Sequence, residues 1–86
     1  MKNEVPWNKI PLSRAMLEII ASKPEGLPES KLETMLKKEY GIETSKPELY
    51  SALMKLELGG LIYVESVGKE LLIKPAPVLY QNNLRS

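Results

Sequence analysis

The sequence predicts a single small α+β domain, in which three helices are followed by a two-stranded hairpin. Apolar residues recur at intervals of three and four in three successive stretches between residues 12 and 58, as on the buried side of a helix. The double glycine Gly59-Gly60 then interrupts the last stretch, and a β-rich run follows at once at residues 61–64. A length of 86 residues with 43% apolar residues fits one globular domain with a modest core.

The first helix is expected at residues 12–21. Lys23-Pro24 ends it, because the residue before a proline disfavours helical backbone, and a loop over residues 23–26 follows. Five residues at helical spacing form its apolar stripe: Leu12, Ala15, Met16, Ile19 and Ile20.

The second helix is expected from about Pro28 to Tyr40. Proline suits the first turn of a helix, where its missing N–H is not needed, and Gly41 can end the helix in a left-handed conformation. Just before this helix, we expect Leu27 to form a short third strand with the hairpin. Four residues form the apolar stripe of the helix: Leu32, Met35, Leu36 and Tyr40.

The third helix is expected from about Lys46 to Leu58, and its start has the clearest local signal. Ser45 and Glu48 have the spacing of a capping box, in which each side chain accepts a hydrogen bond from the backbone N–H of the other residue. Four residues are predicted to face the core: Leu49, Ala52, Leu53 and Leu56.

The hairpin is expected to have strands at residues 61–65 and 71–73, joined by a tip over residues 66–70. Pro75 and Pro77 should stop the second strand, because proline cannot donate a hydrogen bond to a neighbouring strand. The chain is therefore expected to divide into an extended N-terminal arm (residues 1–11), the domain (residues 12–74) and a proline-containing C-terminal tail (residues 75–86).

Residues 48–62 carry a resemblance to a known family. They read Glu-Leu-Tyr-Ser-Ala-Leu-Met-Lys-Leu-Glu-Leu-Gly-Gly-Leu-Ile. The run resembles the third helix and first wing strand of winged-helix proteins, and most of all the PadR-like and MarR-like regulators, in which Leu-Tyr, Ala-Leu, Leu-Glu and Gly-Leu-Ile recur at these spacings. The resemblance implies a winged helix-turn-helix fold and DNA binding in transcription regulation. Winged helices also serve as protein-binding modules.

If the chain binds duplex DNA, the outer side of the third helix is expected to enter the major groove. Lysines around this helix could contact phosphates, which position a protein without specifying a sequence, although solvated surface lysines have the same appearance. Tyr50 or Met54 could contact a thymine methyl group. The candidate DNA-binding residues are Lys37, Lys38, Lys46, Ser51, Lys55 and Lys69.

The alternative is a protein-binding winged helix that acts as an accessory subunit of a replication, transcription or membrane-remodelling complex. The net charge is only +1, and the third helix has no Arg, Asn or Gln, the residues best suited to reading base edges. Tyr50, Met54 and Leu58 form a second apolar stripe, which is an interaction surface unless the domain covers it. Trp7 is either a cap on the core or an anchor for a partner. The terminal arms could also join two copies in a homodimer.

An enzymatic function is not expected, because the chain has no Cys, His or Asp. These absences exclude cysteine nucleophiles, histidine bases and zinc fingers. No glycine-rich phosphate loop occurs, and the glutamates are not clustered as metal ligands would be. We therefore expect no catalytic residue, no metal and no cofactor.

The composition also gives an expectation about the cellular setting. No apolar run approaches the roughly 20 residues of a membrane span, and no signal peptide is visible, so we expect a cytoplasmic protein without a membrane span. All 11 acidic residues are Glu, and Lys supplies most of the 12 basic residues. This bias is similar to the composition of thermophile proteins.

Overall fold

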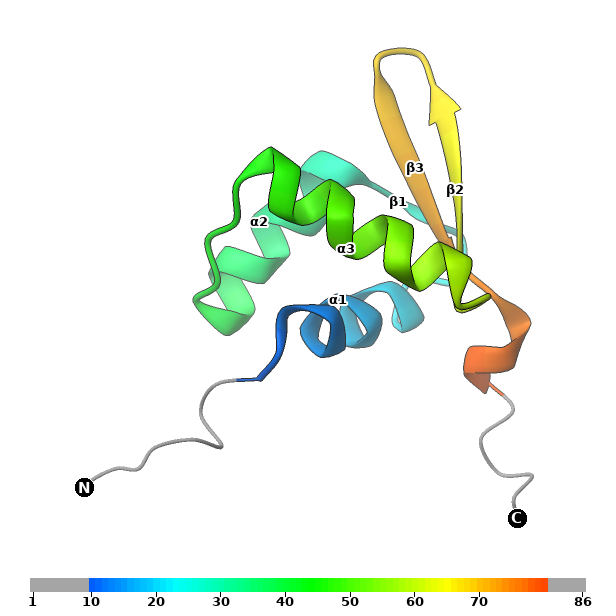
Figure 1. The fold of residues 1–86 in the computed structure, drawn as a ribbon, viewed down its shortest axis with the longest axis horizontal. Helices are drawn as coiled ribbons and strands as arrows, with labels where there is room; N and C mark the ends of the chain where they lie inside the picture. The colour runs from blue at the N-terminus through cyan, green and yellow to red at the C-terminus, as the bar shows by residue number, and fades with distance from the viewer. Residues whose placement is uncertain (1–9, 81–86) are drawn as a thin grey trace.

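The computed structural model describes residues 10–80 of the chain. Three helices pack against one another, and a hairpin projects from one end of the bundle (Figure 1). This is the small α+β winged-helix arrangement that the sequence predicts. The elements are α1 (Leu12–Ala21), β1 (Leu27–Pro28), α2 (Glu29–Tyr40), α3 (Lys46–Leu58), β2 (Ile62–Val67), β3 (Glu70–Pro75) and the short 3-10 helix η2 (Pro77–Tyr80).

The helix boundaries follow the local signals in the sequence. At the start of α3, the Ser45 hydroxyl accepts the Glu48 N–H at 3.2 Å and the Glu48 carboxylate accepts the Ser45 N–H at 3.0 Å, which is the predicted capping box. Helix α2 ends at Gly41, which has a φ of 66° in the left-handed region. It begins one residue later than predicted, because Pro28 has extended backbone and still belongs to β1.

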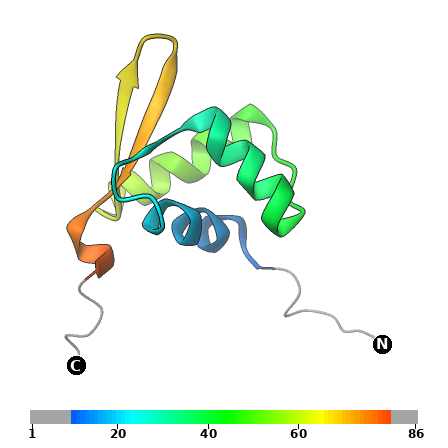
Figure 2. The same cartoon turned by 180° about the vertical axis from the view of Figure 1, so that it is seen from behind.

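The expected short strand β1 joins the hairpin. Leu27 pairs with Ile73 and Pro28 with Leu72, so the antiparallel sheet has the strand order β1-β3-β2. Figure 2 shows β1 passing along the base of the hairpin on its way into α2. The hairpin base is thereby attached to the helices, and its outer half projects beyond them as the wing.

The turn at the tip of the wing is tighter than predicted. Val67 pairs with Glu70, so only Gly68 and Lys69 form the turn, and the predicted five-residue tip is wrong. Gly68 has a φ of 64°, which allows two strands to be joined through so short a turn.

At the base of the wing, β3 continues to Pro75, where Pro75 pairs with Ile62. The strand is therefore two residues longer at this end than predicted, but it ends at Pro75, as expected from the two prolines. On its other side β3 pairs with β1 only through Leu72 and Ile73. The missing N–H of Pro75 consequently interrupts no ladder with β1.

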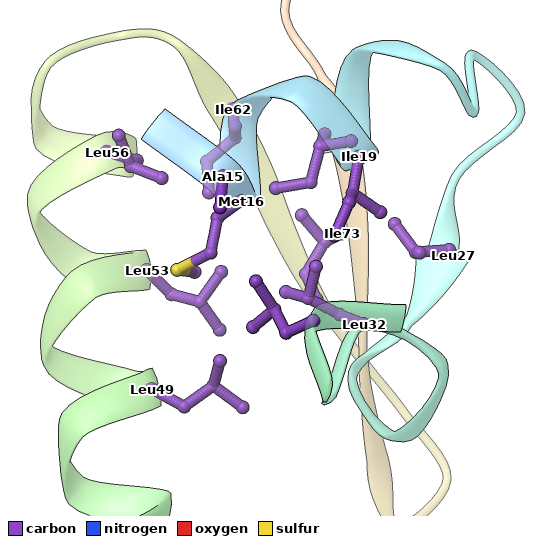
Figure 3. Packing of buried hydrophobic residues seen from close by; sticks show 12 residues of the cluster. Ala15, Met16, Ile19, Leu27, Leu32, Leu49, Leu53, Leu56, Ile62 and Ile73 are labelled. Carbon is purple, nitrogen blue, oxygen red and sulfur yellow. The ribbon is translucent and has the colours of Figure 1, made fainter. Parts of the chain in front are cut away.

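The core lies between the three helices and the inner side of the sheet (Figure 3). Leu53 of α3 points toward Met16 of α1 and is 2% exposed, as predicted for a central core residue. Ala52, predicted on the same side of α3, is only half-buried at its edge. The buried cluster contains Ala15, Met16, Ile19, Ile20, Leu27, Leu32, Leu36, Leu49, Leu53, Leu56, Ile62 and Ile73.

The described part of the C-terminal tail packs back on the domain. Ala76 is buried, and the hydroxyl of Tyr80 in η2 donates a hydrogen bond to the carbonyl of Ala21 at 2.7 Å. Residues 1–9 and 81–86 lie outside the described residues, and with them most of the predicted N-terminal arm, including Trp7.

Candidate interaction surface on α3 and the wing

The outward side of α3 exposes a row of apolar side chains. Tyr50, Met54 and Leu58 lie one turn apart and are 42%, 60% and 81% exposed. We call these three residues the α3 stripe. The sequence predicted this stripe but not whether the domain would cover it, and within the described structure it is uncovered. A continuous apolar row on a helix surface is typical of a binding site.

A groove of about 200 Å³ lies between the α3 stripe and the wing. Val64 of β2 and Leu71 of β3 form its wing side, and Tyr50 and Met54 form its helix side. The groove is mostly apolar, because Glu57 is the one charged residue among those that line it. The full lining is Tyr50, Leu53, Met54, Glu57, Val64 and Leu71.

A buried carboxylate connects the two sides of this groove. Glu29, the first residue of α2, is 5% exposed. One of its oxygens, Oε1, accepts the backbone N–H of Leu71 at 2.9 Å. The other, Oε2, accepts the Tyr50 hydroxyl at 2.7 Å and the Lys46 ammonium at 3.3 Å. The hydrogen bond from Tyr50 is the main cause that lowers the pKa of Glu29 from its ordinary 4.5; Leu71 and Lys46 act in the same direction and burial opposes them.

Two of the candidate DNA-binding lysines have carboxylate partners. Lys46 lies 3.3 Å from Glu29 and 3.2 Å from Glu33, so two acidic side chains share its charge. Lys37 lies 3.0 Å from Glu43, but both side chains are exposed and such a pair is weak. A phosphate would have to compete with these carboxylates for either lysine.

The remaining candidate DNA-binding residues are exposed and widely separated. Lys38, Lys55 and Lys69 have no carboxylate within 4.0 Å among residues 10–80. Lys38 is in the last turn of α2 and Lys69 is at the wing tip. Ser51 and Lys55 line a second groove, between α3 and the start of α1, together with Leu12. The structure therefore brings only Ser51 and Lys55 of this set together.

Sequence reasoning missed two acidic residues that organise this surface. Glu29 lies in the first turn of α2, where an acidic side chain is favoured in any helix, so its position in the sequence gives no sign of its contacts. Glu70 accepts the backbone N–H of Ser30 at 3.1 Å and so caps α2 from the wing. The sequence signal for this cap is weak: Pro28, at the cap position of α2, makes no side-chain hydrogen bond to the helix.

Comparisons with known proteins add no relative to this description. No protein-family model matches the chain, and no curated protein or solved structure matches it either. Within residues 10–80, no helix is both long enough and apolar enough to cross a membrane. In the same part of the chain, no three acidic side chains are grouped as a metal site requires.

Proposed function

We propose that this chain is a protein-binding winged helix that receives a segment of its partner in the groove between α3 and the wing. The observation that carries the proposal is the exposure of the α3 stripe beside that groove. Burying Met54 and Leu58 against a partner would remove apolar area from water, at roughly 25 cal/mol per Å². Burial of the partner's own apolar groups would stabilise the complex in the same way.

The polar groups of the same surface support a protein partner over a base-reading role. Helix α3 has no Arg, Asn or Gln to make paired hydrogen bonds to base edges. Lys46 at its start is held by two carboxylates. Glu48 and Glu57 on the same helix would repel a DNA backbone. Duplex binding in transcription regulation, the leading expectation from the sequence, therefore becomes the second candidate.

The groove also favours one partner chemistry. Its walls take apolar side chains, and Glu57 is the charged group at its lining. A complementary segment therefore presents two or more apolar side chains with a Lys or Arg placed to reach Glu57. We expect an unpaired acidic residue at that position to be rejected, since like charges brought together are costly.

The test is a selection of binding peptides from a random display library with the full chain as target. We expect selected peptides to share apolar residues and a basic residue, and to lose at least tenfold in affinity for Met54→Glu. The matched control is Tyr63→Glu. Tyr63 is 53% exposed, similar to Met54, but it neighbours Val64 on β2 and so points to the opposite face of the wing.

The outcomes of this selection separate the possibilities. Binding that is lost in Met54→Glu and retained in Tyr63→Glu supports the groove as the site. A charge reversal at Glu57 should in addition shift the selected residues from basic to acidic. Peptides that bind Met54→Glu as tightly as the original chain would contradict the proposal.

The second candidate, duplex DNA binding, is favoured by one observation. Lys38, Lys55 and Lys69 have no carboxylate partner among the described residues, so their charges are available to phosphates. Ser51 lies beside Lys55 and could add a hydrogen bond to a phosphate or a base edge. The salt dependence described in the Discussion tests this candidate.

A further inference from the structure

We infer that Glu29 is a positioning residue that holds α3 and the wing at a fixed separation and so preorganises the groove between them. Glu29 does not itself line the groove, and it acts through Tyr50 and Leu71, which do. The inference about positioning stands on the geometry of the chain alone, and its consequence for partner affinity rests on the proposed function.

The two oxygens of the Glu29 carboxylate are divided between the two sides of the groove. Oε1 accepts the N–H of Leu71, whose side chain lines the wing side, at 2.9 Å. Oε2 accepts the hydroxyl of Tyr50, whose ring lines the helix side, at 2.7 Å. A single planar group therefore sets the distance between a backbone atom of β3 and a side chain of α3.

Glu29 belongs to a helix that packs into the core. It is the first residue of α2, and Leu32, three residues further along that helix, is fully buried. The adjacent residue Ser30 is also tied to the wing, since its N–H donates to Glu70 at 3.1 Å. Two carboxylates, one from each element, thus join the start of α2 to the same strand.

Burial makes these contacts hard to exchange for others. A carboxylate that is 5% exposed has little access to water, so losing a donor would leave a buried charge unsatisfied. Lys46 supplies the compensating charge at 3.3 Å from Oε2. The wing is therefore held in one orientation to α3, and a partner does not meet the cost of ordering it.

The experiment compares three variants of the full chain by NMR. Tyr50→Phe removes the hydroxyl and keeps the ring, and Glu29→Gln removes the charge and one acceptor oxygen at nearly constant shape. Glu33→Gln is the matched control, because Glu33 also contacts Lys46 at 3.2 Å but, within residues 10–80, has no hydrogen bond to a residue that lines the groove. Nuclear Overhauser effects between the aromatic ring at position 50 and the Leu71 methyl groups, and exchange broadening along β3, report the separation.

In Tyr50→Phe and Glu29→Gln we expect weaker nuclear Overhauser effects between the ring at position 50 and the Leu71 methyl groups. We also expect new exchange broadening confined to the wing and the start of α3, with core resonances unchanged. Glu33→Gln should resemble the original chain. A peptide selected as above should bind the first two variants about tenfold more weakly, the loss expected for one hydrogen bond to a charged group. Unchanged ring-to-methyl effects in folded Tyr50→Phe would overturn the inference. This NMR result does not depend on any partner, so failure of the proposed function would appear separately, as a chain that selects no peptides.

Discussion

Glu29 and Leu53 show how differently single residues contribute to this molecule. Leu53 is buried because it lies on the core-facing side of α3, as Leu49 and Leu56 do. Glu29 is also buried, yet it is charged, and it accepts hydrogen bonds from three donors in two elements, Lys46 and Tyr50 of α3 and Leu71 of β3. Its ionised form is therefore favoured by the folded structure relative to the unfolded chain.

This preference makes a prediction about pH. The folded-state pKa of Glu29 lies below its ordinary value of 4.5, so its contribution to stability is fully present above that pH. The contribution is lost as the pH falls from about 4.5 through the lowered folded pKa. Glu29→Gln should cost about 1–3 kcal/mol at pH 7, as expected for buried hydrogen bonds to a charged group, and distinctly less at pH 3.

Urea unfolding of the original chain and the variant at several pH values measures this difference. Glu39→Gln is the control on the same helix, because Glu39 is exposed and has no ion pair among residues 10–80. It should change stability little at either pH. A cost for Glu29→Gln that is constant or grows toward acid pH would contradict the assigned role.

Among the elements, the junction between α3 and β2 depends on two adjacent glycines with different conformations. The N–H of Gly60 donates to the Glu57 carbonyl at 2.9 Å, and the N–H of Leu61 donates to the Leu56 carbonyl at 3.0 Å. This pair of bonds is a Schellman motif, in which the residue after the helix is left-handed. Gly60 has a φ of 78°, whereas Gly59 still has helical backbone with a φ of −78°.

The two glycines should therefore respond differently to substitution by alanine. Gly60→Ala should lower stability by about 1–2 kcal/mol, the cost of a left-handed conformation for a residue with a Cβ. The cost is conformational, because a Cβ at Gly60 would meet no atom within 4 Å. Gly59→Ala should be neutral or slightly stabilising, since alanine suits the helical conformation. Thermal unfolding followed by circular dichroism measures both, and equal losses would show that the motif does not control the junction.

At the scale of the whole molecule, charge decides how strongly any polyanion could bind. The net charge is +1, and ion pairs within the described residues occupy Lys46, Lys37 and Lys74. Of the five lysines predicted to bind DNA, Lys38, Lys55 and Lys69 therefore remain as candidates for phosphate contacts. They come from α2, α3 and the wing tip.

If the chain binds duplex DNA, the logarithm of the affinity should fall with the logarithm of salt concentration. Three phosphate contacts give a slope of about −2.7 per protomer, from −0.9 for each neutralised phosphate. Lys55→Glu and Lys69→Glu should each weaken binding, and Glu65→Gln, at an exposed wing residue, should change it little. Fluorescence anisotropy with a labelled random duplex measures the slope. Undetectable binding at low salt, or binding unaffected by both lysine reversals, would exclude this candidate and leave the protein-binding proposal.

The sequence by itself determined the helices, their ends and the core stripe of α3. The capping box joins residues three apart, and the stripe of Leu49, Leu53 and Leu56 repeats within two turns. Such interactions form between near neighbours in the chain, so the pattern of residue types is enough to predict them. The exposed α3 stripe of Tyr50, Met54 and Leu58 could be predicted from the sequence for the same reason.

Only the tertiary structure decided which residues surround the exposed α3 stripe. Glu29 is hydrogen-bonded to Tyr50, 21 residues away in the sequence, and to Leu71, 42 residues away. No local pattern in the sequence predicts such pairs. The lengths of β2 and β3 were likewise set by pairing between strands, which carried β3 to Pro75. A buried carboxylate takes whatever donors the folded chain brings within about 3 Å, and a lysine takes whatever carboxylates lie nearby. The same Lys46 that reads as a phosphate contact in the sequence is therefore, in the folded molecule, part of the support beneath the groove.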